Sequence, residues 1–260
     1  MHVVVPDILA RIVKNKEVEL RETAQQRPEL ERNAALRGSS RNFRAALTAS
    51  APAMIAEIKQ ASPSKGILVD AFHPAAIAKL YSAGGAAALS VLTDWDFFKG
   101  TIEDLRIARA AVNLPVLRKD FTLDELHVME AAAHGADAIL LIAALLDEFR
   151  LRRFRELAAS YKMDALVEVH DQAELERALG SGAEIVGVNN RNLHTFEVTL
   201  ETSLRLAGKI PSGVIKVSES GIHSSADVKT LRGAGFHAFL VGEHLMKSPD
   251  PAATLRELRS

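Results

Sequence analysis

An α/β fold is what this sequence predicts, and three observations support it. After about residue 52, eight short apolar segments recur, and each is followed by a polar cluster and a helical stretch. Strands that alternate with helices in this way form βαβ units and a parallel sheet. Glycine recurs just before several of the segments, where a helix must end and the next strand begin. The length of 260 residues suits a (β/α)8 TIM barrel, which typically has about 250.

The eight strands and the helices between them can be placed in order along the chain. The strands are expected at 53–59, 87–92, 115–119, 138–142, 165–168, 185–189, 214–217 and 238–241. The helices are expected to begin near Pro74, Thr101, Leu123, Asp147, Asp171, Leu200, Ser224 and Asp250. Eight units within about 200 residues favour a closed barrel over an open doubly wound sheet.

The first 50 residues lack this alternation and predict helices instead. An apolar stripe at helical spacing comprises Ile8, Leu9, Ile12, Val13 and Leu20. Pro28 is expected to end that helix, and Phe43, Ala46 and Leu47 suggest a second short one. Two interpretations are open: a solvated helical face, or a lid over one mouth of the barrel. We expect one domain over residues 1–260, with 1–50 as a helical extension packed on the barrel.

Composition excludes several classes of protein. The 32 basic and 33 acidic residues give a net charge of −1, without the basic excess that nucleic acids or anionic membranes require. Cysteine is absent, which excludes disulfides, a thiol nucleophile and cysteine-ligated metals. No signal-peptide core precedes the charged residues, and the longest apolar run, 136–146, is too short to span a bilayer. A cytoplasmic protein is therefore expected. The nine histidines show no metal-binding spacing, so no metal is expected.

Polar residues replace apolar ones at the carboxyl ends of five predicted strands. Residues two apart in a barrel strand point to the same side. By this rule the polar residues point into the barrel, as do the apolar residues of the same parity in each strand. They are Glu57, Lys59, Lys119, Glu168, Asn189 and Glu219. The active sites of such barrels lie at this end. A structural ion pair between neighbouring strands is the alternative. His170 has the opposite parity to Glu168 and is expected to point outward or to lie in the loop.

Two glycine-containing loops predict a phosphate site. Ser220–Gly221 follows the seventh strand, and Gly242–Glu243 follows the eighth. Barrels often hold a phosphate between these loops, where backbone N–H groups can approach it closely. The loop at 62–66 adds hydroxyl groups and a lysine. Ordinary turns that need no ligand are the alternative. Phe97 and Phe98 after the second strand either pack in the loop or contact an aromatic ligand.

Longer motifs resemble those of indole-3-glycerol phosphate synthases over essentially the whole barrel. They are IAEIKQASPSKG at 55–66, LTD at 92–94, FFKG at 97–100, LRKDF at 117–121, LVEVHD at 166–171, GVNNRNL at 187–193 and SESGI at 218–222. The N-terminal helices also resemble those of the family. Glu243 and His244 depart from it, because some members carry a small hydroxyl residue after the glycine.

The resemblance implies a reaction and assigns residues to it. An anthranilate ring closes onto a ribulose-type 5-phosphate chain with loss of CO2 and water, and no cofactor or metal takes part. Lys119 matches the general acid and Glu168 a carboxylate that moves a proton or stabilises charge on the anilino nitrogen. Glu57 is the other essential carboxylate, and Lys59 is its charge partner. The division of acid and base roles among Lys59, Lys119 and Glu168 stays open.

The remaining implied residues bind the substrate. Asn189, Ser220 and Glu219 position it, and Ser62 and Pro63 belong to the substrate loop. Arg191 lies near the substrate carboxylate and phosphate, and Phe98 and Phe121 pack on the ring. The phosphate contacts are expected from Lys59, Ser62, Ser220, Gly221, Gly242 and Glu243.

Three alternatives remain at this stage. Phosphoribosylanthranilate isomerase is another phosphate-binding barrel, but its reaction needs only an acid–base pair, whereas the motifs here hold Glu57, Lys119 and Glu168. A Schiff-base aldolase would use Lys119 as nucleophile. A noncatalytic phosphate-ligand binder would leave the inward charges without a purpose. The expected partner is a phosphorylated small molecule, neither nucleic acid nor membrane, and the chain is expected to be a monomer.

Overall fold

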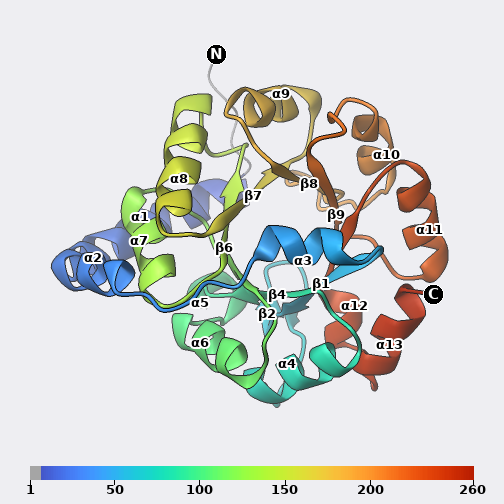
Figure 1. Cartoon of the computed structure of the whole chain (residues 1–260), viewed down its shortest axis with the longest axis horizontal. Helices are drawn as coiled ribbons and strands as arrows, with labels where there is room; N and C mark the ends of the chain where they lie inside the picture. Colours follow the sequence, from blue (N-terminus) through green and yellow to red (C-terminus); the bar gives the residue numbers. More distant parts are fainter. Residues whose placement is uncertain (1–6) are drawn as a thin grey trace.

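Eight parallel strands close into a barrel in the computed structural model, which describes residues 7–260 (Figure 1). They are β1 (Ala53–Ile58), β4 (Ala88–Leu92), β5 (Val116–Lys119), β6 (Ala138–Ile142), β7 (Asp164–Val169), β8 (Ile185–Asn189), β9 (Ile215–Glu219) and β10 (Ala238–Val241). Their order around the barrel is β1-β10-β9-β8-β7-β6-β5-β4. The predicted barrel is confirmed, with strand bounds within two residues of those expected. Residues 1–6, where no signal-peptide core is expected, lie outside the described part.

Helices surround the barrel in Figure 1. They are α4 (Pro74–Ala83), α6 (Ile102–Ala111), α7 (Glu125–Ala133), α8 (Glu148–Ser160), α9 (Gln172–Gly180), α10 (Glu201–Ala207), α11 (Ser225–Gly233) and α13 (Pro251–Leu258). Most predicted starts are N-cap residues, such as Thr101, whose side chain accepts a hydrogen bond from the N–H of Asp104. Elements that were not expected from the sequence are α2 (Arg27–Ala35), α5 (Trp95–Phe98), α12 (Glu243–Met246) and the small pair β2 (Ala61–Ser62) and β3 (Gly66–Ile67). Within residues 7–260 no helix is long and apolar enough to cross a membrane.

The barrel interior confirms the predicted parity of the strands. One buried cluster contains side chains such as Ile55, Leu117 and Leu166, which share parity with the polar residues at the strand ends. The opposite parity packs against the helices, as Met54 and Val91 do. Apolar side chains therefore fill the barrel interior, and polar side chains occupy the inward-pointing positions at the carboxyl ends of the strands.

From residue 7 onward, the N-terminal extension contains three helices, α1 (Asp7–Ala24), α2 (Arg27–Ala35) and α3 (Phe43–Ala49). The prediction that Pro28 ends the first helix is wrong. Pro28 lies in the first turn of α2, where a missing N–H leaves no hydrogen bond unmade.

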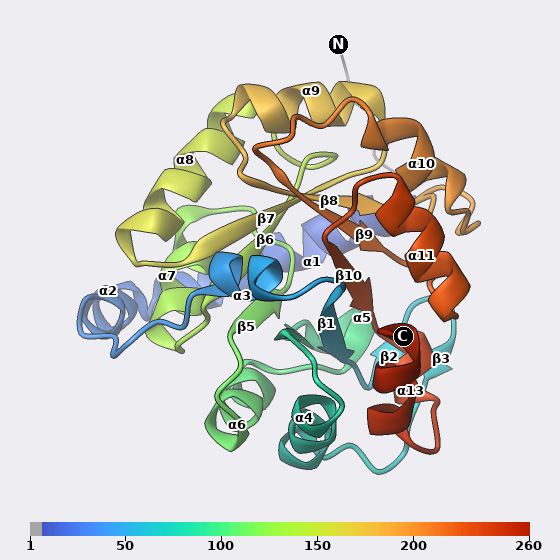
Figure 2. The ribbon, with the colours of Figure 1, turned by 45° about the vertical axis from the view of Figure 1, so that its right-hand side comes forward.

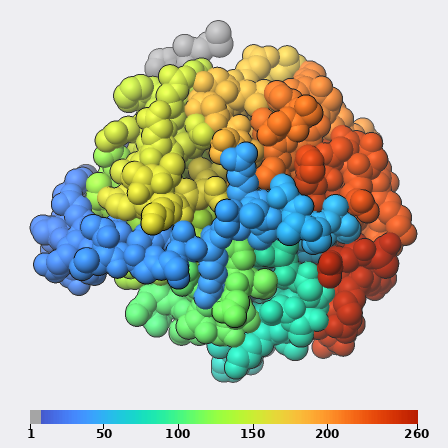
Figure 3. All heavy atoms as spheres, in the orientation of Figure 1, coloured from blue at the N-terminus to red at the C-terminus, as the bar shows by residue number. Residues whose placement is uncertain are grey.

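The last of these helices, α3, covers the amino ends of the strands. Phe43 and Leu47 pack on the interior cluster, and the backbone N–H of Arg44 donates to Asp164 at 2.9 Å. This segment crosses the near face of the molecule in Figure 3.

Helix α1 lies at the opposite end of the barrel, behind the strands in Figure 2. A buried ion pair docks it there. Lys16 is 3% exposed, and its Nζ lies 2.9 Å from Asp94 and 2.9 Å from Asp120. These carboxylates follow β4 and β5, so α1 is held beside the carboxyl ends of the strands. This position favours the interpretation of the extension as a lid.

Lys16→Met is expected to lower the free energy of unfolding by about 3 kcal/mol, because it leaves Asp94 and Asp120 buried without their common partner. Denaturant unfolding measures the change. Lys14→Met, on an exposed face of the same helix, is the matched control and should alter stability by less than about 0.5 kcal/mol. Equal stability of the two variants would contradict the assignment of Lys16 as the docking residue.

Candidate active site

A cavity of about 470 Å³ opens at the carboxyl ends of the barrel strands. This volume is ample for a small-molecule ligand. The structure places every residue that the sequence predicts for the site on its wall: Glu57, Lys59, Ser62, Pro63, Phe98, Lys119, Phe121, Glu168, Asn189, Arg191, Glu219, Ser220, Gly221, Gly242 and Glu243. The strand ends therefore bring together residues that are far apart in the sequence.

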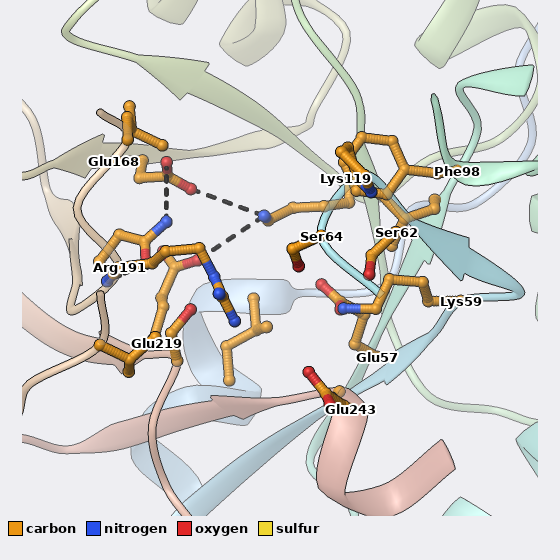
Figure 4. A pocket seen from close by; sticks show the side chains of 18 of the residues that line it. Glu57, Lys59, Ser62, Ser64, Phe98, Lys119, Glu168, Arg191, Glu219 and Glu243 are labelled. Carbon is orange, nitrogen blue, oxygen red and sulfur yellow. Dashed lines mark hydrogen bonds and ion pairs between the residues drawn. The ribbon is translucent and has the colours of Figure 1, made fainter. Parts of the chain in front are cut away.

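Lys119 lies between two carboxylates at the centre of this cavity (Figure 4). Its Nζ is 3.5 Å from Oε2 of Glu168 and 3.8 Å from Oε2 of Glu219. These separations are longer than the 2.9 Å contacts of the docking residue Lys16. Neither Glu219 oxygen has a hydrogen-bond partner within residues 7–260. An ion pair that served only stability would be closer and fully hydrogen-bonded, so the geometry argues against that alternative.

Lys59 and Glu57 form a second pair on the other side of the cavity. Lys59 Nζ donates to Oε1 of Glu57 at 2.5 Å. Although burial alone would raise the pKa of Glu57, the positive charges of Lys59 and Lys119 hold it below its usual value. Glu57 is therefore ionised at neutral pH and keeps Lys59 directed into the cavity.

The environments of Glu168 and Glu219 move their pKa values in opposite directions. Burial raises the pKa of both carboxyl groups. For Glu168, the nearby ammonium of Lys119 outweighs burial and lowers the pKa. For Glu219, the negative charge of Glu168 adds to the effect of burial, and the pKa is raised. The cavity therefore favours an ionised Glu168 beside a protonated Glu219, which is how one site supplies both a base and an acid.

The charge on Lys119 is stabilised by the same neighbours. Burial disfavours the ammonium, but the negative charge of the nearby Glu168 carboxylate holds the pKa of Lys119 above its usual value. Lys119 is therefore protonated at neutral pH and available as a proton donor.

Glycines make room for the buried carboxylates. A Cβ at Gly187 in β8 would collide with Oε1 of Glu219, and one at Gly242 would collide with Oε1 of Glu57. Only glycine at these two positions leaves the carboxylates where they are.

The two predicted phosphate loops are adjacent, because β9 pairs with β10. Ser220 and Gly221 both have positive φ, 67° and 78°, a conformation that glycine adopts without strain. Two histidines that the sequence analysis missed, His223 and His244, line the same end with their rings 5.5 Å apart.

The opposite end of the cavity is apolar and aromatic. The rings of Phe98 and Phe121 lie 6.3 Å apart at a tilt of 36°. Phe97 points elsewhere, toward Arg11 of α1. Apolar residues that were not expected in the site also line the cavity, among them Ile8, Leu9 and Ile12 of α1, and Leu193, Phe196 and Val198 after β8, where Val198 lies beside Gly221 of the phosphate loops. The stripe in α1 is visible in the sequence, but a stripe does not say which surface it covers.

His170 lies in the loop directly after β7, as one of the two expectations has it, and its ring lies beside Glu168 of the cavity wall. Its Nε2 is 3.3 Å from Oε1 of Glu168, and its Nδ1 is 2.9 Å from Oε2 of Glu174. The expectation that His170 lies in the loop is confirmed, because β7 ends at Val169.

Within the described residues, no group of three or more His, Asp and Glu side chains is arranged to hold a metal ion. The carboxylates of the cavity are instead interspersed with Lys59 and Lys119. That the reaction needs no metal or cofactor remains a prediction from the resemblance.

Comparisons with known proteins identify the family of this chain. The sequence profile for indole-3-glycerol phosphate synthase matches residues 9–258. The enzyme of that name from Polaromonas naphthalenivorans is 50% identical over 258 residues, which cover 97% of this chain and 98% of the relative. The one from Koribacter versatilis is 49% identical over 246 residues, 94% of each chain.

Solved structures at lower identity support the fold alone. Thiamine phosphate pyrophosphorylase from Pyrococcus furiosus superposes with a TM-score of 0.61 at 16% identity, over 84% of this chain and 96% of that one. N-acetylmannosamine-6-phosphate 2-epimerase from Clostridium perfringens gives 0.62 at 15% identity, over 80% and 93%. With the profile and the close relatives covering nearly the whole chain, this protein belongs to the indole-3-glycerol phosphate synthase family.

Proposed function

We propose that Lys119, placed between Glu168 and Glu219, is the main general acid of the indole-3-glycerol phosphate synthase reaction in this cavity. That reaction, a step of tryptophan biosynthesis, closes an indole ring on 1-(2-carboxyphenylamino)-1-deoxyribulose 5-phosphate. It releases CO2 and water, so the enzyme is a carboxy-lyase. Family membership argues against the three alternatives, an isomerase, an aldolase and a noncatalytic binder. The position of Lys119, 3.5 Å and 3.8 Å from its two carboxylates, supports its role.

In the first step, the ring carbon that carries the carboxylate attacks the ketone carbon of the sugar chain. The C–C bond forms while the carbonyl electrons move to oxygen, and Lys119 donates a proton to the resulting alkoxide. An ammonium at this point both neutralises the oxyanion and supplies the proton. The ring carboxylate then leaves as CO2, and its bonding electrons restore the aromatic ring.

In the second step, the new hydroxyl leaves as water while a proton is lost from the neighbouring carbon. Glu168 is ionised and close enough to take a proton or to stabilise positive charge on the anilino nitrogen. Asn189 donates to Glu168 at 3.2 Å and keeps it in place. Glu57 holds Lys59 toward the substrate, which makes Lys59 a second candidate donor. Glu219 and Ser220 position the chain.

The two ends of the cavity suit the two ends of the substrate. Phe98 and Phe121, together with the apolar face of α1, provide a surface for the anthranilate ring. The N–H groups of the Ser220–Gly221 and Gly242–Glu243 loops, with Lys59 and Ser62, suit the phosphate at the other end. Arg191 lies on the wall where it can reach the substrate carboxylate or phosphate.

Inorganic phosphate is expected to inhibit competitively, because it should occupy the Ser220–Gly221 and Gly242–Glu243 loops. Gly221→Ala should raise both the inhibition constant and KM by about tenfold, since its positive φ and its contact with Val198 oppose a side chain. Gly213→Ala, at an open position, is the control and should change neither. A crystal grown in concentrated sulfate with only water between the two loops would contradict the assignment.

Three further properties stay predictions from the sequence: a single domain over residues 1–260, a monomeric state and a cytoplasmic location. The contacts of α1 and α3 with opposite ends of the barrel support the first of them.

A further inference from the structure

His170 is a largely buried titratable residue next to Glu168 that the mechanism above does not use. Its side chain is 12% exposed. It contacts two carboxylates, with Nε2 3.3 Å from Oε1 of Glu168 and Nδ1 2.9 Å from Oε2 of Glu174. The imidazole therefore bridges a residue of the cavity and a residue in the first turn of α9.

Glu174 is itself held in place. Its Oε2 accepts the backbone N–H of His170 at 2.8 Å, and its own N–H donates to the N-cap residue Asp171 at 2.8 Å. Because the carboxylate receives both the backbone and the ring of His170, the ring has a fixed direction. That direction places Nε2 against Glu168.

A carboxylate lies beside each ring nitrogen, hydrogen-bonded at Nδ1 and in close charge contact at Nε2. A neutral imidazole would turn a lone pair toward one of the two carboxylates. Burial disfavours the charged ring, but the adjacent carboxylates of Glu168 and Glu174 outweigh it and raise the pKa of His170 to about 10. The ring is then an imidazolium throughout the physiological range.

This contact also orients the carboxylate of Glu168. Oε1 receives the amide of Asn189 at 3.2 Å and faces the ring of His170. Oε2 is left toward Lys119, 3.5 Å away. We propose that His170 is a positioning residue that keeps Glu168 ionised, with Oε2 directed at Lys119. This inference rests on the proposed role of Glu168.

The other charges around Glu168 come from three strands: Lys119 in β5, Glu219 in β9 and Glu57 in β1. Lys119 favours the ionised form of Glu168, and the negative charge of the ionised Glu57 opposes it. Loss of the His170 cation removes a positive charge that stabilises the ionised form of Glu168, so the pKa of Glu168 rises. A larger fraction of Glu168 is then protonated at a given pH, and activity that needs the ionised form is lost at a higher pH.

The experiment compares pH profiles of kcat for the wild type, His170→Asn and Glu174→Gln. His170→Asn should move the acid limb upward by about one pH unit or more, and should lower kcat at the acid end by about tenfold. Glu174→Gln retains the ring but removes its anchor and should shift the limb in the same direction. His134→Asn, at the end of α7 and away from the cavity, is the matched control and should keep the wild-type profile.

The ring nitrogens provide a readout that does not depend on activity. In ¹H–¹⁵N spectra of the wild type at pH 8, both nitrogens of His170 should be protonated. A neutral ring at pH 8, or a wild-type acid limb in both variants, would overturn the proposal. If His170→Asn does not fold, Glu174→Gln and the spectra decide. If Glu168→Gln is fully active, the assigned role of Glu168 fails. If it is inactive while both other variants keep the wild-type profile, only the inference about His170 fails.

Discussion

Lys119→Ala is expected to lower kcat by at least about 10²-fold, the usual scale for a lost general acid. The ammonium is the donor nearest to Glu168 and Glu219, and no other lysine is paired with them in the described structure. The fold should persist, because without the cation Glu168 and Glu219 can share one proton, as close carboxylates do. Steady-state kinetics and thermal melting on the same preparation measure both effects.

Two further variants sharpen this test. Lys119→Arg keeps the charge but not a readily donated proton, so it should restore stability without restoring kcat. Lys65→Ala removes another lysine of the cavity wall, which makes no ion pair within the described residues, and should change kcat much less than Lys119→Ala. A loss below about threefold in Lys119→Ala would exclude Lys119 as the acid.

Glu168→Gln is expected to lower kcat/KM by about 10²-fold or more while the melting temperature stays near that of the wild type. Glutamine keeps a carbonyl oxygen for the amide of Asn189, which lies 3.2 Å from the carboxylate. It neither carries the negative charge nor accepts a proton, so it cannot stabilise the anilino nitrogen or act as a base.

A buried carboxylate outside the cavity is the matched control for this substitution. Glu130 accepts from Arg118 at 2.6 Å and does not line the cavity. Glu130→Gln should reduce stability and leave the activity per folded molecule unchanged, because it breaks a buried ion pair. If Glu168→Gln behaved like this control, Glu168 would be structural and the mechanism would lose that residue.

Much of the site follows from the sequence because strand alternation is a strict rule. Ile55 and Glu57 share parity, as do Leu166 and Glu168, so an inward apolar residue predicts where the next polar one points. The barrel can also be predicted from the sequence, since its strands have apolar patterns of their own and most of its helices begin at a recognisable N-cap residue. Its short elements α5 and α12 are four residues each, too brief to show any periodicity.

The remainder depends on contacts that no local pattern contains. The sequence alone predicts that Lys16 is a solvated residue on a helix, because only the folded chain brings Asp94 and Asp120 next to it. His170 follows the last residue of β7, and parity no longer applies beyond a strand end. Pro28 shows the limit of a single cue, because proline ends one helix as readily as it begins the next.

The contacts of the N-terminal helices have a consequence for the chain as it is synthesised. A ribosome makes α1 and α3 before any of the strands they touch. Arg44 of α3 pairs with Glu184, which is 140 residues further on. Lys16 pairs with Asp120, which is also synthesised later. Contacts between such distant residues form late, because the intervening chain must first be ordered. On the nascent chain the first helices therefore remain undocked until the barrel strands have been synthesised. The wall of the active-site cavity is then completed by α1, one of the first segments to be translated.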